Sequence, residues 1–240
     1  MYGVVPLLSA QQVTDLQSYN GLPDDTTQPP IPESHIQDLA ALFARHHAHE
    51  VFGIHLIHGH FNIPEDTVLL GTNHDAHRCR WTKPSEIQTL DLSKVHGHIF
   101  VLIDRRFHPY EYQAGPAPDL SRVGNTFLPE LASFLNSNDL AGLVGLQVID
   151  PRTSAMFELV LPQGTVMMDA SRLGSCIPTR ETGWQFDVED GRPRVCQANE
   201  IHAATRDGHE IYNKGDPHPR LETFEDVVHA LVEEGILAAV

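Results

Sequence analysis

The chain has 240 residues, and 41% of them are hydrophobic, which suffices for one large domain or two small ones. Its 32 acidic residues outnumber 16 lysines and arginines, so the formal net charge is −16, which repels nucleic acid and anionic membrane surfaces. No run of about 18 apolar residues occurs, and the first residues lack the features of a signal peptide. The three widely spaced cysteines suit a reducing compartment. We therefore expect a cytoplasmic protein whose partner is a small molecule, and a homo-oligomer stays open.

Residues 1–32 read as an N-terminal arm, because proline, aspartate and threonine are dense from 21 to 32 and only residues 9–19 favour a short helix. Apolar residues at helical spacing then predict a helix over 33–47. Buried strands are predicted over 51–57, 68–70 and 94–103, with a turn at 64–66. A second amphipathic helix is expected over 127–136, and a closing helix over 223–234. Between these two helices we expect strands at 145–150, 157–168, 184–188 and 194–196, and a further one at 210–213.

The order of elements repeats along the chain, which predicts an internal duplication. Residues 53–58 align with 145–150, and residues 61–70 align with 157–168, each time after an amphipathic helix. We therefore predict a first α+β repeat over 33–126 and a second over 127–240. The expected α+β fold is one compact duplicated domain, whose helix-plus-antiparallel-strand units form a curved sheet or two facing sheets with helices on one side.

Histidine is the compositional anomaly of the chain, because eleven of its 16 histidines lie between His46 and His108. Two His-Gly-His triplets stand out: His58 with His60, and His96 with His98. Side chains alternate along a strand, so both imidazoles of a triplet should share a face. By the same parity, each pair should lie at the end of an apolar stripe, with Ile54 and Leu56 in one strand and with Phe100 and Leu102 in the other.

Such a histidine cluster suits general acid–base catalysis, because imidazole titrates near neutral pH. In this interpretation His58, His60, His96 and His98 share the acid–base and orienting roles, no cofactor is needed, and Tyr110 supplies a phenolic donor. Alternatively, three of the same four histidines, His58, His60, His96 and His98, ligate one divalent metal ion such as zinc. Under the duplication, Asp150 and His202 are the residues of the second half that could join either site.

The segments 52–61 and 95–100, together with Gly183-Trp184, resemble uncharacterised histidine-rich proteins of filamentous fungi. A histidine-lined apolar pocket would also suit the histidine-bearing type of chalcone isomerase in fungal flavonoid pathways. That resemblance implies secondary metabolism and carries no catalytic residue over to this chain.

The sequence thus predicts a cofactor-independent isomerase, cyclase or lyase for an aromatic or polyketide-like molecule. The alternatives are a mononuclear metal-dependent enzyme and a non-catalytic protein that binds a small molecule or a metal. In the acid–base enzyme, one or two single histidine substitutions should abolish turnover. In the metal-dependent enzyme, several should each remove stoichiometric metal, and the non-catalytic protein has no turnover to lose.

Overall fold

The structure is a computed structural model, which describes residues 17–149, 155–174, 176–196, 200–205, 208–212 and 218–237. Its helices are α1 (Gln17–Asn20), α2 (Glu33–Arg45), α3 (Phe127–Ser137) and α4 (Phe224–Glu233). Its strands are β1 (Phe52–Leu56), β2 (Thr67–His74), β3 (Cys79–Glu86), β4 (Val95–Ile103), β5 (Arg106–Ala114), β6 (Val144–Val148), β7 (Met156–Leu161), β8 (Gly164–Asp169), β9 (Ile177–Trp184), β10 (Phe186–Glu189), β11 (Arg192–Val195) and β12 (Glu200–Ala204). Short 3₁₀ turns occur at Asp25–Thr27 (η2), Ala48–Glu50, Asp75–His77, Ile87–Thr89, Leu92–Lys94 and Ala170–Arg172.

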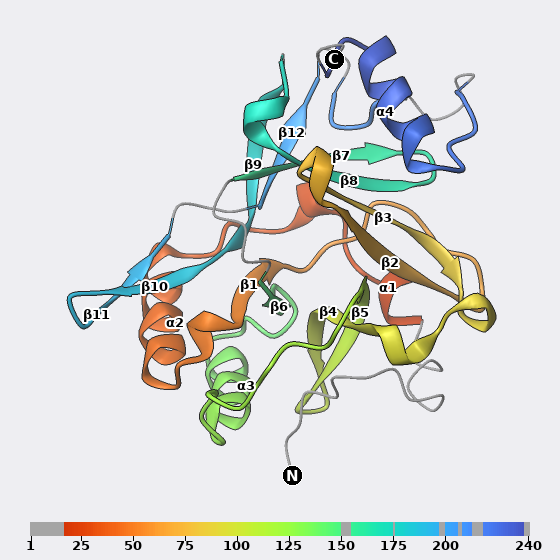
Figure 1. Cartoon of the computed structure of the whole chain (residues 1–240). Coiled ribbons are helices and arrows are strands. Elements are labelled where there is room, and N and C mark those ends of the chain that lie inside the picture. Colours follow the sequence, from red (N-terminus) through yellow and green to blue (C-terminus); the bar gives the residue numbers. More distant parts are fainter. Residues whose placement is uncertain are drawn as a thin grey trace.

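Ten of the strands close into a barrel in the order β1-β6-β4-β5-β2-β3-β8-β7-β12-β9, while β10 and β11 form a separate hairpin (Figure 1). Neighbouring strands are antiparallel except for the pairs β2 with β5 and β7 with β12. The barrel is completed where β9 pairs with β1. The predicted α+β fold of helix-plus-strand units in a curved sheet or two facing sheets is therefore wrong.

The helices cover the outside of the barrel. Helices α2 and α3 pack on apolar residues of β1, β4 and β6, among them Ile54, Leu56 and Phe100. Helix α4 packs on β3, β7 and β8 through a second apolar cluster. These helices agree with the three that the sequence predicts over 33–47, 127–136 and 223–234. No helix in the described part of the chain is long and apolar enough to cross a membrane.

The inside of the barrel is polar over much of its length, and this explains the error in fold class. Strands β3 and β5 alternate between outward apolar side chains and inward polar ones such as Arg80, Thr82 and Gln113, which are all buried. Sequence reasoning left both segments without a strand, because polar alternation there resembles an exposed loop. Without β3 and β5 the sheet cannot be closed.

The barrel takes strands from both predicted repeats, with β1 to β5 from residues 52–114, and with β6 to β9 and β12 from residues 144–204. The duplication itself, with its boundaries at 33–126 and 127–240, stays a prediction. Of the predicted N-terminal arm 1–32, the structure describes residues 17–32, so most of the expected helix over 9–19 lies outside the described residues. Asp150 also lies outside them.

Gly145 tests how tightly β6 fits between β1 and β4. A Cβ atom at this position would lie 2.7 Å from the backbone oxygen of Phe100 and 3.3 Å from Ile57. We expect Gly145→Ala to lower the free energy of unfolding by about 1–3 kcal/mol, the usual cost of overpacking. Gly142→Ala is the control, because a Cβ atom there meets nothing within 4 Å. Equal stabilities of the two variants in urea denaturation would contradict the described packing.

Candidate metal centre

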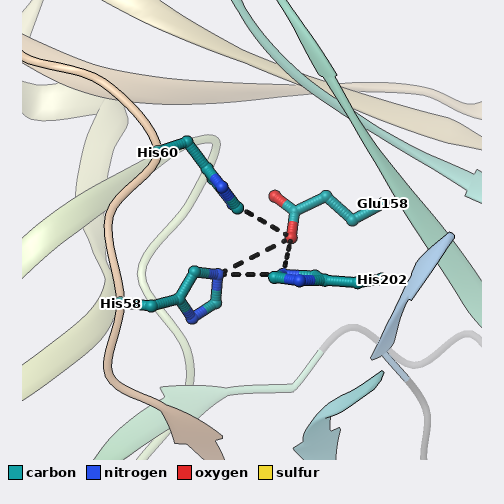
Figure 2. Close-up of side chains that lie close together, drawn as sticks. All are labelled: His58, His60, Glu158 and His202. Atoms are coloured by element: carbon teal, nitrogen blue, oxygen red, sulfur yellow. Dashed lines mark hydrogen bonds and ion pairs between the residues drawn. The ribbon is translucent and has the colours of Figure 1, made fainter. Parts of the chain in front are cut away.

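Four side chains converge at one end of the barrel: His58, His60, Glu158 and His202 (Figure 2). His58 and His60 lie in the loop that follows β1, Glu158 lies on β7, and His202 lies on β12. Glu158 and His202 are direct partners in the parallel pairing of β7 with β12. Parallel partners present their side chains to the same face, so the pairing itself places this carboxylate beside this imidazole.

The nitrogen and oxygen atoms of the cluster are as close together as the ligands of one metal ion. His202 Nε2 lies 3.0 Å from Glu158 Oε2 and 3.0 Å from His58 Nε2. Glu158 Oε2 also lies 3.6 Å from His60 Nε2 and 3.8 Å from His58 Nε2. Metal–ligand bonds of roughly 2.0–2.1 Å put tetrahedral ligands about 3.3 Å apart. All four ligand atoms lie within 4.8 Å of one another, so one cation fits among them.

The outer nitrogens of two imidazoles are already hydrogen-bonded. His58 Nδ1 lies 2.7 Å from the carbonyl oxygen of Leu56, which can only accept, so Nδ1 carries the proton and Nε2 keeps its lone pair. His202 Nδ1 donates in the same way to the carboxylate of Asp25, at 3.0 Å. Such second-shell acceptors orient metal-binding histidines and fix their tautomer.

A segment before α2 closes this end of the barrel and holds the histidine loop in place. Asp25 begins the short turn η2. The Tyr19 hydroxyl accepts from the backbone N–H of His60 at 3.3 Å, and the Pro23 carbonyl accepts from Gly59 at 3.0 Å. The Gln28 side chain donates to the Ile57 carbonyl at 2.8 Å. His58 and His60 therefore reach Glu158 from a loop fixed on both sides, although the sequence places them on a strand.

Burial and charge shift the ionisation of the cluster in opposite directions. Burial lowers the pKa of His58 to about 4, with Glu158 opposing the shift. Burial also acts on His202, but hydrogen bonds to Asp25 and Glu158 outweigh it and raise the pKa of that imidazole to about 9. The three imidazoles hold the pKa of Glu158 well below its usual range, against the effect of burial. In the metal-free protein His202 is therefore the group that keeps a proton at neutral pH.

The second triplet lies at the opposite end of the barrel. Strands β1 and β4 both run antiparallel to β6, so they are parallel to each other. His58 and His60 follow the end of β1, whereas His96 and His98 lie at the start of β4. The structure thus divides the four predicted site histidines between two places, so no three of them assemble around one ion as predicted.

His96 and His98 face a cavity of about 380 Å³ that Arg80 and Gln113 also line. Arg80 donates to His98 Nε2 at 2.5 Å and to Glu200 Oε1 at 3.2 Å. Burial and the adjacent guanidinium hold the pKa of His98 well below its usual value, so this imidazole is neutral. His98 thus belongs to a buried hydrogen-bonded network, whereas His96 Nδ1 lies 3.3 Å from the Gly115 carbonyl oxygen.

That network extends along the barrel toward the four-residue cluster. Glu200 Oε2 accepts from the Gln147 amide at 2.7 Å and lies 3.4 Å from His55 Nε2. Tyr110, the predicted phenolic donor, lies 3.4 Å from His55 Nδ1 through its hydroxyl. The His55 ring stacks at 5.1 Å on the ring of His58, one of the four clustered residues. Tyr110 therefore reaches the cluster through His55.

Sequence reasoning named His58, His60 and His202 and missed Glu158, Asp25, Arg80 and Glu111. Glu158 had a recognisable signal, because it is the only charged residue in the apolar run from Met156 to Leu161. A charge inside a buried strand is costly unless it is paired, so it points to a site. Asp25 offered no such signal, since this residue is 155 residues or more from its partners on β9 and β12.

No known protein family matches the chain, and no curated protein or solved structure is similar to it. The resemblance to fungal proteins and to the chalcone isomerase type therefore stays a prediction, and function must be argued from the site.

The metal-free protein should lose stability as the pH rises from 7 to 9. The folded-state pKa of His202 is about 9, above its ordinary value of 6.5, so its contribution is fully present below pH 6.5 and disappears as the pH rises through 9. We expect a decrease in the free energy of unfolding of up to about 2–3 kcal/mol over this range. The decrease should be absent in His202→Gln, and urea denaturation at pH 7, 8 and 9 measures it. An equal decrease in both proteins would contradict the assignment.

Proposed function

We propose that the protein is a metal-dependent enzyme that binds one divalent transition-metal ion through His58, His60, Glu158 and His202. One observation carries this proposal: the Nε2 atoms of His58 and His202 face each other at 3.0 Å, while both Nδ1 atoms are bound to acceptors. Two facing lone pairs repel each other unless a cation or a proton lies between them. Three imidazoles and one carboxylate favour zinc, iron or a similar ion over calcium or magnesium.

A metal ion would also compensate the buried negative charge of the cluster. Glu158 is 7% exposed and brings one negative charge, which neutral imidazoles only partly offset. A divalent ion leaves the site with a net positive charge and would act as a Lewis acid on an oxygen atom of a bound substrate. His58 and His202 are 5% and 1% exposed, so bulk water is largely excluded from this electrophile.

Acid–base catalysis without a metal is the second candidate, and it has its own support. In that case His202 is an imidazolium ion, as its raised pKa favours, and it shares its Nε2 proton with Glu158 and His58. A proton donor and a proton acceptor then stand side by side, as an isomerase, cyclase or lyase requires. This form agrees with the acid–base function that the sequence predicts, with His202 and Glu158 in place of His96 and His98.

Metal content separates the two candidates. We expect untagged protein purified without chelator to carry about one equivalent of a transition metal by elemental analysis, the stoichiometry of a mononuclear site. His60→Gln and Glu158→Gln should each abolish stoichiometric binding. Asp25→Asn should weaken affinity about 10–100-fold, as the loss of a second-shell acceptor does.

His96→Gln is the matched control, because this variant removes a barrel histidine at the far end and should keep the full equivalent. A folded protein that takes up no zinc, cobalt or manganese on dialysis would exclude the metal-dependent function and leave the acid–base one.

A further inference from the structure

Glu111 points into the barrel because two neighbouring strands are irregular at the same level. In the pairing of β4 with β5, Gly97 is opposite Tyr112, Ile99 opposite Glu111, and Phe100 opposite Pro109. One residue is therefore extra on each strand, His98 on β4 and Tyr110 on β5. Such bulges let two successive side chains point to the same face. Tyr110 reaches His55 inside the barrel, and Glu111 faces inward beside it.

Glu111 differs from the other two carboxylates of the interior. Glu158 is surrounded by three imidazoles, and Glu200 by Arg80, Gln147 and His55. Within the described part of the chain, Glu111 makes no hydrogen bond and no ion pair. An unpaired carboxylate is expensive to bury, and protonation or contact with water or a ligand offsets that cost.

The surroundings of Glu111 place it between the two polar clusters. The charged groups that act on it are Arg80, Glu158, His55 and Glu200. Glu158 and Glu200 are buried, at 7% and 5% exposure, whereas Glu111 keeps intermediate solvent accessibility. A side chain enclosed by interior groups but still accessible borders a space that can hold water. Burial raises the pKa of Glu111 to about 7, so both of its protonation states are populated near neutral pH.

We propose that Glu111 is the proton-transfer residue of the metal site, acting on a small carbonyl compound that has a C–H bond next to the carbonyl group. This inference rests on the proposed metal-dependent function. The carboxylate of Glu111 takes the proton as the C–H bond breaks, and the electron pair forms the carbon–carbon double bond of an enolate. The protonated Glu111 then returns the proton to the same or a neighbouring carbon, which restores the carboxylate. The step needs no oxidant or reductant.

The arrangement favours this proton transfer over hydrolysis. A Lewis acid at the cluster would stabilise the enolate oxygen, while Glu111 supplies the base from β5, across the barrel from β7 and β12. The closed end of the barrel keeps water away from the enolate.

Acetohydroxamic acid tests the position of Glu111 without knowledge of the substrate, because this probe binds a metal ion and gives up a proton when it does so. The experiment is calorimetric titration of zinc-loaded protein at pH 8 in two buffers of different ionisation enthalpy. A zinc ion at the cluster favours the ionised form of Glu111, so in the wild type this carboxylate should take up the probe's proton. Glu111→Gln cannot accept that proton, so on binding the probe this variant should release about one more proton to the buffer than the wild type does.

Azide is the control ligand, because it occupies the same position on the metal and brings no proton. Equal proton release from both proteins overturns the proposal, as does loss of zinc from Glu111→Gln or failure of the zinc-loaded wild type to bind the probe. Absence of any metal from the wild type instead defeats the proposed function itself, so the two failures are distinguishable.

Deuterium exchange into hydroxyacetone, followed by NMR, tests the substrate class. Glu111→Gln should lower the exchange rate of the zinc-loaded protein at least about 100-fold, the usual range for loss of a general base. If the wild type exchanges deuterium into hydroxyacetone no faster than His60→Gln does, the carbonyl assignment is overturned.

Discussion

Burying carboxylates inside a closed barrel requires that other groups compensate their charge, and this requirement organises the interior of the molecule. Glu200 is compensated by the protein alone, since Arg80, Gln147 and His55 surround it and, against burial, hold its pKa near 2. Among the described residues, the ion-pair partners of Glu158 are imidazoles, which are cationic only when protonated. Its charge balance is complete only with a proton on His202 or a metal ion, and the facing Nε2 atoms of His58 and His202 impose the same choice.

The rest of the fold positions these groups. Parallel pairing of β7 with β12 sets Glu158 beside His202, and the segment before α2 contributes Asp25 and seals the barrel end (Figure 1). The irregular pairing of β4 with β5 turns His98 and Glu111 inward at one level. The candidate site is thus built by segments from both ends of the chain, and none of the histidine-rich stretches could form it alone.

The sequence predicted those features that depend on local pattern. Helices α2, α3 and α4 were predictable because each has one apolar stripe. Strands β1 and β4 were predictable because their outward residues are apolar. Strands β3 and β5 were missed because their inward positions hold polar side chains such as Arg80 and Gln113. Barrel closure depends on long-range pairing of β9 with β1, which no local pattern encodes.

The site shows the same division between local and long-range information. The triplet spacing identified His58 and His60. Strand parity correctly put His96 and His98 on one face, but the bulge left Phe100 and Leu102 on the other, against the helices.

The metal site that unites the loop after β1 with β7 and β12 is tested most directly by anomalous diffraction at the absorption edge of the bound metal, from crystals grown without chelator. The account predicts one peak about 2.0–2.2 Å from the Nε2 atoms of the three histidines and from Glu158 Oε2. A metal-containing protein with its peak elsewhere, or no peak at this site, would contradict it.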